Sequence, residues 1–304
     1  MGVMIEGIFH EQDPGPASDA AGRFERSRSS IRRWIGQDAD HPAEPGRYHL
    51  FVAWNCPWAH RALLIRALKG LEDISLSIAR PRRTEAGWVF DATGAYADTL
   101  FGSTALHEVY AADAAPYSGR ITVPILWDKT AGRAVSNESA DIVRMLNDAF
   151  DGPDFAPPAL RDAIDAWNAR IYRDINNGVY RAGFARTQAA YDEAVAEVFQ
   201  ALDDIESHLE QHDWLCGTEF TEADLRLFPT LARFDVAYHY AFKCNLRRLI
   251  DYPALWRYAR RIYAMPGVAD TVTFEIYKNG YFSRSELRNP LGIVPAGPLI
   301  DWSL

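Results

Sequence analysis

The pattern of hydrophobic and polar positions divides the chain into three parts. Residues 1–46 are rich in Gly, Pro, Ser, Asp and Arg and show little apolar periodicity, so they are predicted to form an extension that wraps a surface. Residues 47–152 mix strand-like and helix-like segments, whereas the pattern over 157–304 is helical. We therefore expect two domains of different class behind an N-terminal extension.

The 47–152 segment predicts a thioredoxin-like domain. Its expected elements, in order, are a strand over 48–53, a helix over 57–70, a strand over 73–78, a hairpin over 121–136 and a helix over 138–147. Residues 73–78 alternate apolar and polar side chains, which indicates a strand with one face in water. This order is typical of a mostly parallel sheet that holds an active site at the end of its first strand.

The 157–304 segment predicts an all-helical domain. One apolar stripe runs from Leu160 to Ile175, and a longer helix ends at Leu209 after a cap at Thr187. Thr221 and Asp224 have the spacing of a capping box. A last helix is expected over 253–265, followed by a tail that contributes to a substrate pocket.

Composition narrows the class of protein. The 304 residues are 48% hydrophobic and 24% charged, which is ordinary for a folded chain. The formal net charge of -9 argues against a general nucleic-acid binder, because such proteins need a basic face. No run approaches the ~20 apolar residues of a membrane span. No cleavable signal pattern is visible either, so a cytoplasmic protein without membrane partners is expected.

Cys56 is the candidate nucleophile. It stands between a predicted strand and the helix that opens with Pro57, where unpaired backbone N–H groups and the helix dipole favour the thiolate. Cys56-Pro57-Trp58-Ala59 contains no second cysteine, so another thiol must resolve any mixed disulfide formed there. Glutathione is the most abundant cytosolic candidate. The alternative is a buried, inert thiol.

Two downstream motifs add to this interpretation. Val123-Pro124 opens a predicted strand, and in thioredoxin-like folds such a proline exposes the backbone of the preceding residue to a peptide ligand. Glu138-Ser139 starts a predicted helix, where backbone N–H groups and a hydroxyl hold a carboxylate while a glutamate pairs with an amine. Taken alone, Glu138-Ser139 is better explained as an ordinary helix cap, and only its position downstream of Val123-Pro124 favours a ligand site.

The other residues indicate no metal and no nucleotide cofactor. The three cysteines are too few and too widely spaced for a disulfide framework or a four-ligand zinc site, and the histidines lack paired helical spacing. No Gly-rich phosphate loop is present. Cys216 and Cys244 lie among aromatic or apolar residues and are expected to be structural.

Together these residues resemble the xi-class glutathione transferases, also called S-glutathionyl-hydroquinone reductases. The resemblance spans nearly the whole chain and is specific because many short motifs agree. They are Arg47-Tyr48-His49-Leu50, Cys56-Pro57-Trp58-Ala59-His60-Arg61, Gly87-Trp88, Tyr117-Ser118-Gly119-Arg120, Thr122-Val123-Pro124, Ser136-Asn137-Glu138-Ser139, Ile171-Tyr172, Asn176-Asn177-Gly178-Val179-Tyr180 and Phe242-Lys243-Cys244.

The resemblance implies a reaction and a set of site residues. Cys56 attacks the sulfur of a glutathionylated hydroquinone, and a second glutathione resolves the mixed disulfide. The residues expected to hold glutathione are Trp88, Arg120, Val123 through its backbone, Glu138 and Ser139. Tyr172 and Tyr281 are expected at the hydroquinone pocket, although Tyr172 is also explained as a core aromatic on a helix stripe. A homodimer is expected from the family.

The sequence departs from the family in the half that binds the aromatic group. The family's His-Tyr pair is Gly280-Tyr281 here, an upstream histidine is replaced by Ile276, and Ala53-Trp54-Asn55 precede the nucleophile. We therefore predict a divergent member whose aromatic substrate differs from the usual hydroquinones. Two alternatives stay open: a glutathione lyase or thiol transferase acting on another bond, such as an aryl ether, and a non-catalytic ligand carrier.

Overall fold

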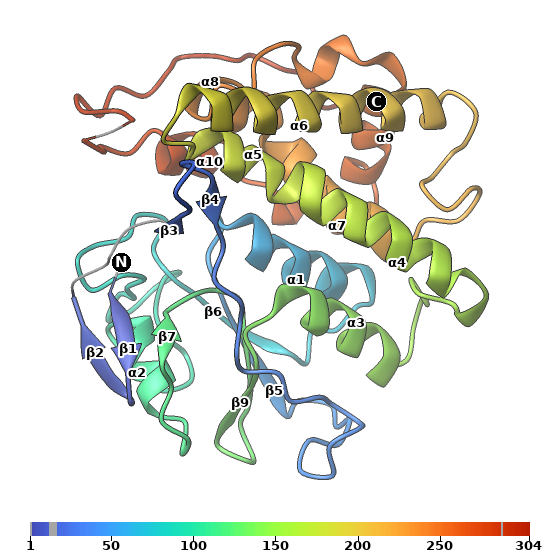
Figure 1. Ribbon diagram of the computed structural model, residues 1–304. Helices are drawn as coiled ribbons and strands as arrows, with labels where there is room; N and C mark the ends of the chain where they lie inside the picture. The colour runs from blue at the N-terminus through green and yellow to red at the C-terminus, as the bar shows by residue number, and fades with distance from the viewer. Residues whose placement is uncertain (1, 12–16, 287) are drawn as a thin grey trace. The chain divides into compact units, whose positions relative to one another are not determined.

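A computed structural model describes residues 2–11, 17–286 and 288–304 (Figure 1). The described residues fall into two units: one holds those of 1–15 and 27–153, and the other those of 16–26 and 154–304. The N-terminal 46 residues are thus shared between both units. A mixed sheet with helices in the first unit and a helical second unit confirm the predicted thioredoxin-like and all-helical classes.

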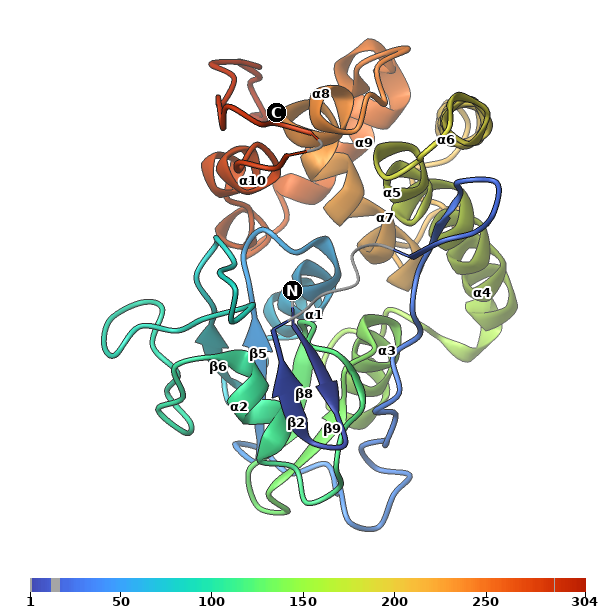
Figure 2. The same ribbon diagram turned by 60° about the vertical axis from the view of Figure 1, so that its left-hand side comes forward.

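The first unit is built around a four-stranded sheet with the order β6-β5-β8-β9. The elements of this unit are β1 (Val3–Ile5), β2 (Ile8–His10), β5 (Tyr48–Val52), α1 (Pro57–Leu68), β6 (Ser75–Ile78), α2 (Leu106–Ala111), β7 (Gly119–Arg120), β8 (Ile125–Asp128), β9 (Arg133–Ser136) and α3 (Ser139–Ala149). Figure 2 shows the four strands side by side, with α1 and α3 next to each other against them. All five residues of β5 are buried, which fits a central strand.

Two expectations for this sheet are wrong. Only the β5–β6 pair is parallel, whereas β5–β8 and β8–β9 are antiparallel, because the chain enters β8 from the opposite end and returns through a hairpin. The expected wet face of β6 is wrong at Ser77, which is buried. Its hydroxyl lies 2.9 Å from His49 Nε2 and 3.0 Å from an Asp98 carboxylate oxygen, so a polar network replaces water there.

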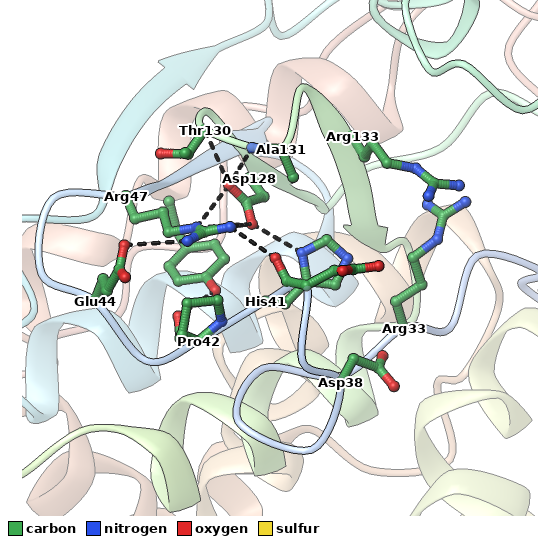
Figure 3. A network of polar contacts seen from close by, with 12 residues as sticks. Arg33, Asp38, His41, Pro42, Glu44, Arg47, Asp128, Thr130, Ala131 and Arg133 are labelled. Atoms are coloured by element: carbon green, nitrogen blue, oxygen red, sulfur yellow. Dashed lines mark hydrogen bonds and ion pairs between the residues drawn. The ribbon is translucent and has the colours of Figure 1, made fainter.

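The turn between β8 and β9 is held by the buried carboxylate of Asp128 (Figure 3). That carboxylate accepts hydrogen bonds from Nε of Arg47 at 2.9 Å and from the backbone N–H groups of Thr130 and Ala131, also at 2.9 Å. Nδ1 of His41 lies 2.8 Å from it. The arginine is the main reason why the pKa of Asp128 stays below its usual value despite burial. These hydrogen bonds connect the segment before β5 to the hairpin formed by β8 and β9.

The N-terminal strand β1 is the middle strand of a second, three-stranded sheet with the order β2-β1-β7. Val3 pairs with Arg120, and Met4 pairs with Gly119. The Met4 side chain is 1% exposed, so this strand is anchored in a core. Arg120 is therefore placed by a strand that lies more than a hundred residues earlier in the chain.

The second unit consists of helices plus one short hairpin. Its elements are β3 (Ala17–Ser18), β4 (Phe24–Glu25), α4 (Arg161–Arg170), α5 (Gly178–Gly183), α6 (Gln188–Leu209), α7 (Glu222–Arg233), α8 (His239–Ala241), α9 (Pro253–Tyr263) and α10 (Phe274–Tyr281). Short 3-10 helices lie at Pro158–Leu160, Leu249–Asp251 and Ala269–Thr271, and π-helices lie at Ile171–Asn176 and Phe234–Tyr238. Figure 1 shows α5 packed along α6, and residues of the two helices are in contact.

Capping at two helix starts agrees with the sequence. Thr187 caps α6 by accepting the backbone N–H of Ala190 at 3.2 Å. At α7, the Asp224 carboxylate accepts the backbone N–H of Thr221 at 2.8 Å, which confirms that half of the expected capping box. The two π-helices and α10 were not expected.

Candidate active site

Cys56 lies at the N-cap of α1, and three residues separate it from the end of β5. Its φ and ψ of -83° and 117° are extended, and Pro57 occupies the first helical turn. The Cys56 N–H donates to Ala53 and its carbonyl accepts from His60, so the backbone is fixed on both sides. The side chain is half-buried, as a reactive thiol requires. A helix start supplies N–H groups and a positive dipole end, both of which favour a thiolate.

Val123 is brought directly to the thiol. The Cys56 Sγ atom lies 3.5 Å from the Val123 carbonyl oxygen, within hydrogen-bonding distance for sulfur. The Val123-Pro124 peptide bond is cis. Thr122, the residue before Val123, is held by the buried Tyr110, whose hydroxyl donates to the Thr122 carbonyl at 2.9 Å. The two motifs that the sequence indicated therefore meet in one place.

Glu138 and Ser139 open α3, which packs against α1. The Glu138 carboxylate accepts the backbone N–H of Ala140 at 3.1 Å, so the helix-cap interpretation is correct for that side chain. Ser139 is 3% exposed, and its Oγ accepts a hydrogen bond from Nη1 of the buried Arg61 at 3.3 Å. The Arg61 guanidinium also lies over the Trp58 ring, 4.6 Å from its centroid. Arg61 had no predicted role, yet it links the second turn of α1 to the start of α3.

Trp88 and Arg120 lie on other segments of the same unit. Trp88 is 6% exposed, its carbonyl accepts the N–H of Leu106, and the Arg83 guanidinium lies 5.3 Å from its ring centroid. Arg120 ends β7, and its carbonyl accepts the Tyr117 hydroxyl at 2.9 Å. Both positions are thus fixed through backbone contacts.

The two predicted substrate tyrosines lie in the second unit. Tyr172 lies on a π-helix and is 44% exposed, so the alternative of a core aromatic is wrong. Tyr281 ends α10, and its hydroxyl lies 2.8 Å from that of Tyr180 and 3.0 Å from that of Tyr238. Sequence analysis missed Tyr238 altogether and gave Tyr180 no role, although Tyr180 closes the Asn-Asn-Gly-Val-Tyr motif.

The remaining cysteines lie in environments that suppress the thiolate. Cys244 is fully buried, and burial raises its pKa to about 12. Burial also raises the pKa of Cys216. Within the described ranges, no group of three or more His, Cys, Asp or Glu side chains is arranged to hold a metal ion. No helix in that part of the chain is both long and apolar enough to span a membrane.

Comparison with known proteins identifies the family. Residues 55–149 match the glutathione S-transferase N-terminal domain, and residues 188–261 match its C-terminal domain. The chain is 48% identical to the glutathionyl-hydroquinone reductase YqjG of Escherichia coli over 99% of this chain and 96% of that protein.

Solved structures agree with this match. The glutathione-bound structure of YqjG has a TM-score of 0.88 at 44% identity, covering 98% of this chain and 96% of that one. The glutathione S-transferase Xi of Phanerochaete chrysosporium has a TM-score of 0.89 at 43% identity, covering 95% of this chain and 96% of that one. The chain therefore belongs to the glutathione S-transferase family, within its xi class.

Proposed function

We propose that this protein is a glutathione-dependent reductase that removes glutathione from glutathionyl-hydroquinone-type aromatic adducts. The observation that carries the proposal is Cys56 at the start of α1 with its Sγ atom 3.5 Å from the Val123 carbonyl. A helix start favours the thiolate, and thiolates exchange with sulfur electrophiles. The 48% identity to a glutathionyl-hydroquinone reductase supports the same chemistry.

The reaction has two steps, and only the second is a thiol–disulfide exchange. The Cys56 thiolate attacks the glutathione sulfur of the adduct, so a sulfur–sulfur bond forms while the bond from sulfur to the aromatic carbon breaks. The electron pair of that bond passes to the ring carbon, which takes up a proton to give the hydroquinone. A second glutathione thiolate then attacks the mixed disulfide, releasing oxidised glutathione and restoring the Cys56 thiolate.

Glutathione binding is assigned to the first unit, over residues 47–152. Ser139 and Glu138 at the start of α3 hold the carboxylate and amine of its γ-glutamyl end. Val123 pairs with its cysteine through the backbone, and Trp88 and Arg120 complete the site. These roles rest on the family motifs. The burial of Ser139 and the contact between Cys56 and Val123 support them.

The aromatic group is assigned to residues 157–304 and their C-terminal tail. Tyr281 hydrogen-bonds the hydroquinone oxygen, and Tyr172 contacts the ring. Burial raises the pKa of Tyr281 well above its ordinary value, so its hydroxyl keeps its proton at neutral pH and acts as a donor. We also assign a homodimeric, cytoplasmic state, which sedimentation of the purified protein and fractionation of cells would check.

The deciding experiment uses glutathionyl-menadiol and glutathione as substrates. Hydroquinone and oxidised glutathione should appear together with wild-type protein and disappear with Cys56→Ala. Cys216→Ala is the matched control, because that thiol is also half-buried, yet burial raises its pKa. Hydroquinone release that persists in Cys56→Ala would refute the mechanism.

The Gly280-Tyr281 pair favours a second candidate, in which the same thiol serves a different aromatic substrate. Gly280 provides no side chain beside Tyr281 where the family has histidine. Product analysis separates the two candidates, because cleavage of an aryl ether leaves a glutathione conjugate rather than oxidised glutathione. Turnover of glutathionyl-menadiol equal to that of a His-Tyr relative would remove the case for an altered substrate. A Cys56 thiol that does not react at neutral pH would indicate a ligand carrier.

A further inference from the structure

The turn that carries Cys56 and a hairpin over residues 80–89 leave the sheet of the first unit at the same edge. β5 and β6 are parallel neighbours, Val52 pairs with Ile78, and each segment follows the end of its strand. Parallel neighbouring strands end at the same side of a sheet. The nucleophile turn, residues 53–56, and the hairpin are therefore neighbours in the fold.

The returning arm of the hairpin is held by the start of α2. The N–H of Arg80 donates to the Val89 carbonyl at 2.8 Å and joins the two arms. The Trp88 carbonyl accepts the N–H of Leu106, the first residue of α2, at 2.9 Å. Trp88 is the residue of this arm that we assign to glutathione. Both contacts reach the backbone, so the rotation of the indole ring depends on the side chains packed against it.

The outgoing arm carries an arginine that lies on that ring. The guanidinium carbon of Arg83 is 5.3 Å from the centroid of the Trp88 ring, and Arg83 is exposed. A cation near the face of an indole is attracted by its π electrons, which favours one orientation of the ring. Arg83 orients Trp88 only while the outgoing arm keeps its place.

Asn55 joins the outgoing arm to the nucleophile turn. Its Nδ2 atom donates to the Pro81 carbonyl at 2.9 Å, from a half-buried position. Asn55 directly precedes Cys56 and belongs to the segment in which this sequence departs from the family. The Cys56 N–H donates to the Ala53 carbonyl at 3.1 Å, so the backbone that carries the amide is itself fixed. The nucleophile turn therefore holds the arm two residues before Arg83.

We propose that Asn55 is a positioning residue for glutathione binding. It holds the outgoing arm of the 80–89 hairpin, so that Arg83 keeps the Trp88 ring in the orientation that binds the peptide. This inference rests on the proposed function for the role of Trp88. Asn55 acts through the arm and not on the thiol, so its loss weakens glutathione binding and leaves the reactivity of Cys56 unchanged.

Isothermal titration calorimetry with glutathione tests this proposal without turnover. Asn55→Ala should raise the dissociation constant roughly threefold, the size of effect expected when one neutral hydrogen bond is lost. The rate of Cys56 alkylation by iodoacetamide, measured against pH, should keep the wild-type midpoint. Gln200→Ala is the matched control, because that amide is on the exposed face of α6 and donates to Asp204 one turn away, at 2.9 Å. It should bind glutathione like the wild type.

A double-mutant cycle separates positioning from a general loss of stability. Arg83→Met removes the cation from the Trp88 ring at an exposed position and should weaken glutathione binding roughly threefold, as expected for an exposed cation–π contact. Because Asn55 acts through Arg83, the double variant should bind no more than about twofold more weakly than Arg83→Met alone. Two independent effects would instead multiply to about ninefold.

Several results would overturn the proposal. They are equal affinities of wild type and folded Asn55→Ala, an alkylation midpoint that shifts in Asn55→Ala, and a ninefold loss in the double variant. Asn55→Leu, which has a similar size and no donor, replaces Asn55→Ala if that protein does not fold, and unchanged binding by Arg83→Met refutes the route without either variant.

Glutathionyl-menadiol turnover, measured on the same samples, separates this inference from the reductase assignment. A wild type that turns over the adduct while all variants bind glutathione equally refutes the role of Asn55 alone. The expected affinity changes without hydroquinone release refute the reductase assignment and support the role of Asn55. A wild type that binds no glutathione refutes both.

Discussion

The Sγ atom of Cys56 and the carbonyl oxygen of Val123 lie 3.5 Å apart, although 67 residues separate them in the sequence. The first residue caps α1, and the second precedes β8, the strand that pairs with β5. Sheet pairing therefore holds the thiol beside a peptide group. A cysteine-containing peptide bound to that backbone would present its own sulfur to Cys56.

This geometry predicts that Cys56 alone becomes glutathionylated. With one equivalent of glutathionyl-menadiol and no added glutathione, the protein should gain the mass of one glutathionyl group on the peptide that contains Cys56. Adding glutathione should remove it. Cys56→Ser should lower steady-state turnover by roughly 10³-fold or more, since loss of a covalent nucleophile has effects of this order.

Cys244 is the internal comparison for that experiment. It is fully buried, and burial raises its pKa to about 12, so it should remain unmodified in the native protein. Adduct found on Cys244 rather than on Cys56 before unfolding would contradict the assignment of the nucleophile.

Local signals in the sequence were sufficient for several helix and strand boundaries. A strand that ends just before Cys56, a proline in the next position and the Thr187 cap each act over a few residues, and the structure has all three. Composition and spacing determine such features because the interacting groups are neighbours in the chain.

Features that depend on distant residues were not predictable from the same signals. β1 has three residues and no periodicity, and its partner β7 has two, so their pairing appears only in the fold. Ser77 looks like a surface residue until His49 and Asp98 are placed around it. The hydroxyls of Tyr180, Tyr238 and Tyr281 meet although they come from α5, the second π-helix and α10. The sequence carries no strong helix signal for α10.

The start of α3 provides a test of glutathione binding. Ser139→Ala removes a hydroxyl that accepts from Arg61 and that we assign to the γ-glutamyl carboxylate. Loss of such a contact costs about 1–2 kcal/mol, so the dissociation constant for glutathione should rise roughly 5- to 30-fold. Isothermal titration calorimetry gives the value directly.

Ser207→Ala is the matched variant for this comparison. Its hydroxyl is exposed on α6 and donates only to the Asp203 carbonyl one turn away. It should bind glutathione like the wild type. Equal affinity of Ser139→Ala and Ser207→Ala would exclude Ser139 from the glutathione site.

The Asp128 network should stabilise the first unit in a pH-dependent way. Asp128→Ala removes the acceptor of Arg47 Nε and of two backbone N–H groups, which should cost about 3 kcal/mol of unfolding free energy. The pKa of Asp128 is lower in the folded protein, so its contribution is complete above the unfolded pKa of about 3.9 and is lost as pH falls through the folded value. The unfolding free energies of wild type and Asp128→Ala, measured by urea unfolding, should therefore differ at neutral pH and converge only at acidic pH.

His49 should destabilise the folded state in a different pH window. It is 1% exposed, its ring nitrogens lie 2.7 Å from Ser75 Oγ and 2.9 Å from Ser77 Oγ, and burial lowers its pKa from 6.5 to about 4. Above pH 6.5 the imidazole is neutral in both folded and unfolded protein, so it adds no pH dependence there. Between 6.5 and about 4 only the unfolded chain gains the proton, so folding loses stability progressively.

The size of this loss follows from the shift. At 1.36 kcal/mol per pKa unit, the folded state should lose about 3 kcal/mol by the time the pH reaches the folded pKa. His49→Gln keeps a polar, neutral side chain that does not titrate. Between pH 6.5 and 4 its unfolding free energy should therefore fall by about 3 kcal/mol less than that of the wild type. Parallel slopes for wild type and His49→Gln between pH 6.5 and 4 would mean that the buried imidazole accepts a proton without unfolding.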